Sequence, residues 1–162
     1  MSSLLLTGFQ GSGKTTVGRI MAARGFGSFI DTDELVCDQT GFQSVRELYR
    51  EVGEKTFRTC ELQVLLALGA DSPSVIALGG GTLLHPASQA KARGLGRIVY
   101  LFLPQDKLRL DPQALFLQGR DMKEFFDERD ALYTKCADVR LDISGMSPES
   151  VAEHIVKELY GK

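Results

Sequence analysis

The chain has 162 residues, of which 43% are hydrophobic and 25% are charged, and this composition is ordinary for a single globular domain. Nineteen basic and 21 acidic residues leave a net charge of −2, which gives no electrostatic reason to expect a nucleic-acid or membrane partner. No apolar run approaches the ~20 residues that would span a bilayer.

Strand-like and helix-like segments alternate along the chain, which predicts an α/β domain with a parallel sheet covered by helices on both faces. Apolar runs predict strands at 3–7, 28–30, 74–78, 97–102 and 139–143. Periodicity and capping signals predict helices at 16–24, around Val36, and at 44–49, 54–68, 86–93, 121–136 and 148–159.

A complete phosphate-binding motif, G-x-x-x-x-G-K-[ST], occupies residues 8–15 as GFQGSGKT. It follows a predicted strand and precedes a predicted helix, the context that distinguishes this motif from a ligand-free glycine turn. Backbone N–H groups would surround a polyphosphate at the helix N-terminus, and the lysine would reach its β- and γ-phosphates. The residues expected to bind a nucleoside triphosphate are Gly11, Ser12, Gly13, Lys14, Thr15 and Thr16.

Two carboxylates, Asp31 and Asp33, follow the second predicted strand. Because ligands bind at the carboxyl ends of parallel strands, both lie at the expected phosphate edge of the sheet. Asp31 could approach the shell of a Mg²⁺ ion that Thr15 ligates, and Asp33 could orient or deprotonate a substrate hydroxyl. Either residue could instead only cap the helix through Val36.

The glycine run Gly79, Gly80 and Gly81 follows the third predicted strand and reaches the same edge. Without Cβ atoms, a ligand could lie directly against this backbone, although a tight turn would explain the run equally. Arg58 lies on a predicted helix with Glu61 three residues later, where the carboxylate could hold the guanidinium. A fixed arginine suits bidentate binding of a carboxylate, but Arg58 could also be an ordinary exposed helix residue.

Residues 104–120 are the least regular part of the chain, between the fourth and fifth predicted strands. A long polar excursion from a compact α/β domain is typical of a mobile lid, which would keep water away from the nucleotide. A solvated surface loop is the alternative.

The cysteines and histidines suggest neither a disulfide framework nor a metal site. Cys37, Cys60 and Cys136 are odd in number and lack C-x-x-C spacing, so they read as free thiols in a reducing compartment. His85 and His154 stand apart and read as structural or surface residues. Since the amino terminus also lacks a signal-like segment, we expect a cytoplasmic protein.

These segments together resemble the shikimate kinase family. The resemblance covers most of the chain in the family's order: GFQGSGKTT, IDTDEL, G-x-x-S-V-R-E-L, GEKTFRTCE, ALGGGT and DERDALYTKCAD. It implies ATP-dependent transfer of the γ-phosphoryl group to the 3-hydroxyl of shikimate, in chorismate and aromatic amino acid biosynthesis. The implied cofactor is Mg²⁺ and the implied partners are the small molecules ATP and shikimate.

The implied architecture is one P-loop kinase domain, residues 1–162, with a five-stranded parallel sheet similar to that of nucleoside monophosphate kinases. Substrate-binding helices would lie at about 33–61 and a lid at about 104–120. We expect a monomer.

The resemblance also assigns roles on the donor side of the reaction. Lys14 would contact the transferred phosphate, and Thr15 would bind Mg²⁺ with support from Asp31. Asp33 would hold the substrate hydroxyls, including the one that attacks.

On the acceptor side, Arg58 and Arg129 would clamp the shikimate carboxylate. The three glycines, Gly79, Gly80 and Gly81, would line the pocket around it.

Two departures from the family pattern concern basic residues. The lid lacks a clean R-P-L-L-like segment; Arg120 lies nearest the expected distance beyond the fourth strand and is assigned as the catalytic, ATP-binding lid arginine, with Arg109 as the second choice. The basic residue that contacts adenine in the family has no counterpart at residues 144–149.

Two alternatives remain open. One is a different small-molecule kinase of the same fold, such as a gluconate kinase, although this chain has DTDEL where those enzymes usually have G-D-x-L-H. The other is a non-catalytic ATP-binding module. Adenylate-type kinases are disfavoured because the acceptor-side residues suit a carboxylate and not a base.

Overall fold

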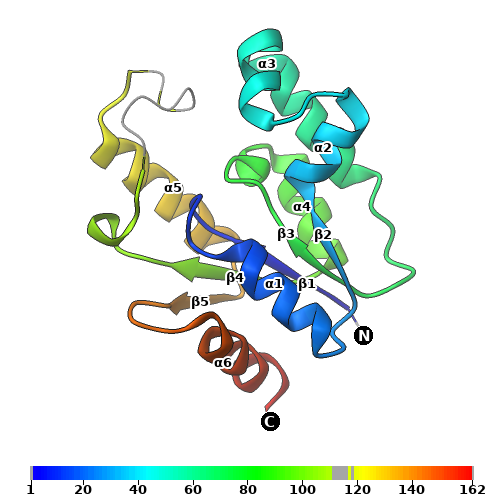
Figure 1. Ribbon diagram of the computed structural model, residues 1–162, viewed down its shortest axis with the longest axis vertical. Coiled ribbons are helices and arrows are strands. Elements are labelled where there is room, and N and C mark those ends of the chain that lie inside the picture. The colour runs from blue at the N-terminus through cyan, green and yellow to red at the C-terminus, as the bar shows by residue number, and fades with distance from the viewer. Residues whose placement is uncertain (1, 111–116, 118, 162) are drawn as a thin grey trace.

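The computed structural model describes residues 2–110, 117 and 119–161 of the chain. Within that part, five parallel strands form a sheet in the order β2-β3-β1-β4-β5 (Figure 1). This confirms the α/β fold with a five-stranded parallel sheet. The strands are β1 (Ser3–Thr7), β2 (Ser28–Asp31), β3 (Ser74–Ala77), β4 (Gly96–Phe102) and β5 (Val139–Asp142).

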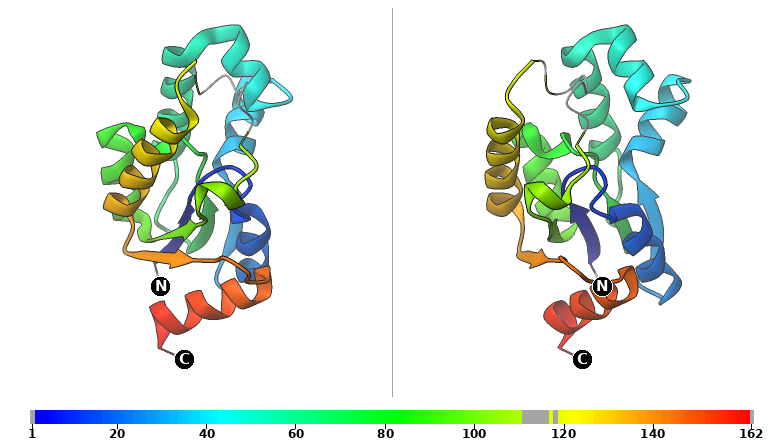
Figure 2. Two further views of the ribbon diagram at one scale, coloured as in Figure 1. Left: turned by 90° about the vertical axis from the view of Figure 1, so that its left-hand side faces the viewer. Right: turned by 60° about the vertical axis from the view of Figure 1, so that its left-hand side comes forward.

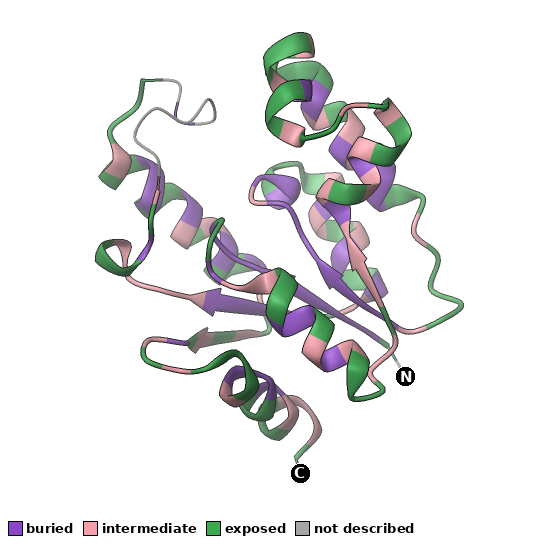
Figure 3. Ribbon diagram, viewed as in Figure 1, coloured by how far each residue is buried: buried purple, intermediate pink, exposed green. Residues whose placement is uncertain are grey.

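The central strand β1 is buried along its whole length. Because side chains alternate along a strand, Leu4 and Leu6 point to one face of the sheet and Leu5 to the other. The edge strands β2 and β5 are less buried than the three strands between them (Figure 3). Continuous apolar runs in the inner strands are what a sheet covered on both faces requires.

Helices cover both faces of the sheet (Figures 1 and 2). Helices α1 and α6 pack on the face that carries Leu4 and Leu6, and helices α3, α4 and α5 contribute residues to the opposite cluster. The helices are α1 (Lys14–Ala23), α2 (Thr32–Thr40), α3 (Val45–Leu66), α4 (Pro86–Leu95), α5 (Met122–Cys136) and α6 (Pro148–Tyr160), with short 3-10 helices η1 (Thr82–Leu84) and η2 (Gln105–Lys107).

Helix α3 changes direction at Gly53. The φ of this residue is 81° and its ψ is 171°, a combination far from helical values and strained for a residue with a Cβ atom. The separate predicted helices at 44–49 and 54–68 therefore correspond to the two arms of α3. The first arm begins at Ser44, whose hydroxyl accepts a hydrogen bond of 3.1 Å from the backbone N–H of Glu47.

Thr32 joins the carboxyl ends of β2 and β3. Its hydroxyl accepts a hydrogen bond of 2.9 Å from the backbone N–H of Gly79 and donates one of 3.4 Å to the carbonyl of Ala77. The side chain is buried, so this link is shielded from water. As a result, the residues after β2 and those after β3 are held side by side at one edge of the sheet.

The three cysteines are free, as expected. His85 has a structural role, because its Nδ1 accepts a hydrogen bond of 3.0 Å from the backbone N–H of Ala87 and caps α4. Among the residues described, none of the helices is both long and apolar enough to cross a membrane.

Candidate active site

A cavity of about 660 Å³ opens at the carboxyl edge of the sheet, within the usual size range for a small-molecule site. Its walls come from the loop after β1, the start of α2, both arms of α3, the loop after β3, the segment after β4 and helix α5. Five basic and three acidic side chains line it: Lys14, Arg46, Arg58, Arg109, Arg129, Asp31, Asp33 and Glu61. This surplus of positive charge suits anionic ligands.

The phosphate loop, residues 8–15, connects β1 to α1. Gly13 precedes the helix with a φ of 90°, and no side chain caps the helix start. The first N–H groups of α1 are therefore available to an anion. Of the six residues predicted to bind the triphosphate, five line the cavity: Gly11, Gly13, Lys14, Thr15 and Thr16.

Ser12 is the sixth predicted residue, and its position differs. Its side chain is buried and does not line the cavity, while its backbone N–H donates a hydrogen bond of 3.2 Å to the carbonyl of Phe9. Ser12 therefore stabilises the conformation of the phosphate loop from the side that faces away from the cavity.

Lys14 extends along the inside of the phosphate loop. Its Nζ donates hydrogen bonds of 2.7 Å to the carbonyl of Gly8 and 3.0 Å to the carbonyl of Phe9. Burial lowers the pKa of Lys14 to about 8, although the nearby carboxylates of Asp33 and Asp31 oppose this shift. The ammonium group is thus held where a bound phosphate would restore its usual preference for the charged form.

Asp31 does two things at once. Its Oδ1 accepts hydrogen bonds from the backbone N–H groups of Asp33 (2.9 Å) and Glu34 (3.4 Å), which caps α2. Its Oδ2 accepts a hydrogen bond of 3.2 Å from the hydroxyl of Thr15. The capping function and the proposed metal-side position are therefore compatible, because each uses a different oxygen.

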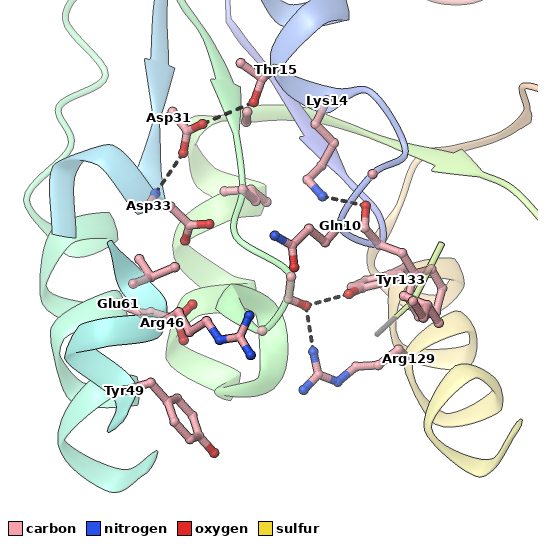
Figure 4. A pocket seen from close by; sticks show the side chains of 18 of the residues that line it. Gln10, Lys14, Thr15, Asp31, Asp33, Arg46, Tyr49, Glu61, Arg129 and Tyr133 are labelled. Carbon is pink, nitrogen blue, oxygen red and sulfur yellow. Dashed lines mark hydrogen bonds between the residues drawn. The ribbon is translucent and has the colours of Figure 1, made fainter. Parts of the chain in front are cut away.

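Asp33 also lines the cavity and lies between the phosphate loop and Glu61 (Figure 4). Burial raises the pKa of Asp33 to about 6, helped by the negative charges of Glu61 and Asp31 and opposed by Lys14 and Arg58. Gly79 makes room for this carboxylate, because a Cβ atom at position 79 would collide with Oδ1 of Asp33. Gly79 itself does not line the cavity.

The guanidinium of Arg58 is fixed by Glu61, as the spacing predicts. Nη1 of Arg58 donates a hydrogen bond of 2.6 Å to Oε1 of Glu61, and the hydroxyl of Thr82 donates one of 3.4 Å to the other carboxylate oxygen. Burial raises the pKa of Glu61, while the charge of Arg58 opposes that shift. A Cβ atom at Gly81 would overlap the guanidinium, so Gly81 leaves the space that Arg58 occupies.

Arg129 reaches the cavity from α5, on the side facing Glu61 and Arg46 (Figure 4). The side chain is buried, and its Nη1 donates a hydrogen bond of 2.8 Å to the carbonyl of Gly80. Its guanidinium also lies 4.8 Å from the centre of the Phe125 ring. The structure therefore brings the two arginines predicted to bind a carboxylate, 71 positions apart in the chain, into one cavity.

The two candidate lid arginines are placed differently. Arg109 lines the cavity, whereas Arg120 does not. Nη1 of Arg120 donates a hydrogen bond of 2.5 Å to Glu128, and its guanidinium lies 5.4 Å from the centre of the Phe125 ring. The proposed lid, 104–120, includes residues 111–116 and 118, which lie outside the described part of the chain. Residues 144–149 do not line the cavity either.

Comparison with known proteins identifies the family of this chain. A sequence model described as shikimate kinase matches residues 10–160. A shikimate kinase from Caldanaerobacter subterraneus subsp. tengcongensis is 35% identical to this chain, over 97% of this chain and 95% of its own length. The chain belongs to the shikimate kinase family.

Solved structures agree with this assignment. A shikimate kinase from Acinetobacter baumannii, in complex with shikimate, superposes with a TM-score of 0.86 at 27% identity, covering 99% of this chain and 94% of that one. A shikimate kinase from Aquifex aeolicus superposes with a TM-score of 0.82 at 29% identity, covering 98% of this chain and 96% of that one. The resemblance inferred from the motifs is confirmed.

In this member of the shikimate kinase family, several lining residues are missing from the sequence prediction: Gln10, Val45, Arg46, Tyr49, Phe57 and Tyr133. Val45 and Tyr49 are four residues apart on the first arm of α3, so helical spacing places them on one face. The ring of Tyr49 meets the ring of Phe57, from the second arm, edge to face at 5.4 Å. Helical spacing could have suggested that Val45 and Tyr49 share a face. It could not have suggested the contact between Tyr49 and Phe57, which lie on opposite sides of the bend at Gly53.

Proposed function

We propose that this protein transfers the γ-phosphoryl group of ATP to the 3-hydroxyl of shikimate, giving shikimate 3-phosphate and ADP. One observation carries the proposal. Asp33 lines one cavity with Lys14 of the phosphate loop and with Arg58, whose guanidinium is held by Glu61. The charges of Lys14 and Arg58 both oppose the rise in the pKa of Asp33. A hydroxylated carboxylate held by the arginine would therefore present a hydroxyl to Asp33 beside the phosphate donor.

The donor side is built for positioning and for neutralising negative charge, which is most of what phosphoryl transfer requires. Backbone N–H groups of the phosphate loop and the start of α1 would bind the phosphates of ATP. Lys14 would exchange its carbonyl partners, Gly8 and Phe9, for oxygens of the transferred group.

Thr15 and Asp31 fit a magnesium ion. Their oxygens lie 3.2 Å apart at the phosphate loop, and Mg²⁺ prefers one or two protein oxygens together with phosphate oxygens and water. We assign Mg²⁺ as the cofactor held by these two residues. When bound, it would neutralise charge on the phosphates.

On the acceptor side, Arg58 and Arg129 would bind the shikimate carboxylate from the α3 wall and the α5 wall. Asp33 would accept the hydrogen bond of the 3-hydroxyl and so direct that oxygen toward the γ-phosphorus. As the new bond to phosphorus forms, the 3-hydroxyl releases its proton toward the Asp33 carboxylate. The bond to the oxygen bridging the β- and γ-phosphates breaks and ADP leaves.

An arginine from the segment 104–120 would further neutralise the phosphates of ATP. Arg109 is the stronger candidate because it lines the cavity, whereas Arg120 is paired with Glu128. We retain the proposal that this segment acts as a lid.

We also propose that the protein acts in the cytoplasm as a monomer and binds only small molecules. The three free thiols are consistent with a reducing compartment. The residues assigned to the acceptor and to the phosphate loop line one cavity of this chain, which supports the proposal of a monomer.

A coupled assay of ADP release tests the proposal, with shikimate, gluconate and AMP offered in parallel. We expect turnover that depends on shikimate and on Mg²⁺. Turnover with gluconate or AMP but not shikimate would mean a different kinase of this fold, and ATP binding without turnover would mean a non-catalytic module.

Replacing Asp33 with asparagine separates binding from transfer. The Asp33→Asn protein should bind ATP normally and lose most phosphoryl transfer, because an amide oxygen is a weaker hydrogen-bond acceptor and a far weaker base. Transfer that survives nearly intact would contradict the role assigned to Asp33.

A further inference from the structure

Tyr133 on α5 is almost completely buried, with 1% of its surface exposed, yet it lines the cavity. Its hydroxyl donates a hydrogen bond of 2.5 Å to the carbonyl of Gly80. The same carbonyl accepts the 2.8 Å hydrogen bond from Nη1 of Arg129 (Figure 4). A carbonyl oxygen has two lone pairs, so these two donors from one helix satisfy it fully.

The carbonyl of Gly80 lies in a segment whose own backbone is flexible and which other residues must therefore hold in place. Residues 79–81, which we call the glycine loop, are three consecutive glycines, the residue type with the greatest backbone freedom. On either side of Gly80, the loop packs against Asp33 and Arg58 so closely that a methyl group would not fit. A small movement of the loop would therefore displace the residues assigned to the acceptor.

The ring of Tyr133 is itself held by the phosphate loop. The ring of Phe9 meets it edge to face, with centres 5.2 Å apart, and stacks on Phe126 at 4.8 Å. The carbonyl of Phe9 accepts a hydrogen bond from Lys14. Contacts thus run without a break from the donor lysine through Phe9 and Tyr133 to the glycine loop.

We propose that Tyr133 is a positioning residue: its hydroxyl fixes the carbonyl of Gly80, and through it the guanidinium of Arg129 and the glycine loop, relative to the phosphate loop. This inference rests on the proposed function, because it concerns the orientation of groups that bind the acceptor carboxylate. Tyr133 acts through Gly80 and Arg129, to which its contacts lead.

A matched pair of tyrosine variants tests this role. Tyr133→Phe removes the hydroxyl and keeps the ring in its aromatic cluster. Tyr100→Phe is the control, because Tyr100 is equally buried and its ring lies 5.1 Å from that of Tyr133, but its hydroxyl donates to Asp130 and it does not line the cavity. Both variants lose one buried hydroxyl, and only the first loses a contact to the glycine loop.

We expect Tyr133→Phe to raise the KM and Kd for shikimate by about three- to ten-fold, the size of one lost hydrogen bond, with the KM for ATP nearly unchanged. Tyr100→Phe should lower the melting temperature to a similar extent and leave the shikimate constants within about two-fold. Equal shikimate constants in the two variants would overturn the proposal, as would a change in Tyr133→Phe confined to the melting temperature.

The Kd for the methyl ester of shikimate gives a second readout. This Kd can be measured at low temperature even if Tyr133→Phe is too unstable for kinetics. Because the ester has no charged carboxylate for Arg129 to bind, the difference in Kd between wild type and Tyr133→Phe should shrink to within about two-fold. An undiminished difference would contradict action through Arg129. If the wild-type protein itself neither binds nor phosphorylates shikimate, the proposed function fails, which is a separate outcome.

Discussion

Nη1 of Arg58 lies 2.6 Å from Oε1 of Glu61, one turn further along α3, and both side chains border the candidate acceptor site. This pair explains how a long, rotatable side chain can present a fixed binding surface. Glu61 is buried and Thr82 occupies its second oxygen, so the carboxylate has little freedom to release the arginine.

Replacing Glu61 with glutamine should weaken shikimate binding. The loss of a charged hydrogen bond of about 1.5–3 kcal/mol predicts a rise of about ten-fold or more in the KM for shikimate, with a nearly unchanged KM for ATP. Glu54→Gln is the control, since Glu54 also faces Arg58 but is half-exposed, with its Oε1 3.9 Å from Nε. Equal effects of the two substitutions would argue against a special role for Glu61.

The pH dependence of kcat/KM for shikimate should be bell-shaped. Asp33 must be ionised to accept the hydroxyl hydrogen, and its pKa is raised to about 6, so activity should rise as the pH passes 6. Lys14 must be protonated to bind ATP, and its pKa is lowered to about 8 in the ligand-free cavity, so with ATP below its KM activity should fall above that pH. A profile that is flat between pH 5 and 9 would contradict both assignments.

The acidic limb of that profile should also respond to Glu61. The negative charge of Glu61 raises the pKa of Asp33, so Glu61→Gln should lower that pKa and move the acidic limb to lower pH. Measuring kcat/KM across pH 4.5 to 7 in both proteins checks the direction. A shift to higher pH would show that another group controls this limb.

Replacing Gly81 with alanine should damage the acceptor site alone. The added methyl group would overlap the guanidinium of Arg58, and overpacking of about 1–3 kcal/mol predicts a rise of about five- to hundred-fold in the KM for shikimate. Gly94→Ala is the matched control, because position 94 on α4 has no neighbouring atom within 4 Å of the new methyl group. Impaired ATP binding in Gly81→Ala, measured by calorimetry, would count against this account.

The two arginines near the segment 104–120 should differ in importance. Arg109→Ala should lower kcat by about ten-fold or more. A cation beside the transferring phosphate typically lowers the activation free energy by several kcal/mol. Arg120→Ala should cost less, since Arg120 pairs with Glu128 outside the cavity. The reverse order, from initial rates with both substrates saturating, would restore Arg120 as the lid arginine.

Much of this site can be predicted from local sequence. The phosphate loop follows β1 directly, Asp31 ends β2 and Asp33 lies two residues beyond it. Parallel strands bring their carboxyl ends to one edge of the sheet. The pairing of Arg58 with Glu61 follows from helical geometry, because residues three apart share a face. In each of these cases the deciding contact is close in the chain or is imposed by the sheet.

The remaining features depend on contacts between distant segments. The hydroxyl of Tyr133 meets a carbonyl 53 residues away, and no periodicity in the sequence indicates that bond. Arg46 and Tyr49 line the cavity from the first arm of α3, which meets the second arm at the bend at Gly53. The distance along the chain predicts Arg120 as the lid arginine, but distance alone cannot show that Glu128, two turns into the next helix, binds it.

The proposed reaction moves the γ-phosphoryl group of ATP to the 3-hydroxyl of shikimate. The most direct test is to incubate the protein with ATP, Mg²⁺ and shikimate and to locate the phosphate in the product by phosphorus–proton correlation NMR. We expect one phosphate ester, coupled to the proton on C3 and formed in equal amount with ADP. An ester at another hydroxyl, or ADP released with only inorganic phosphate as the second product, would contradict it.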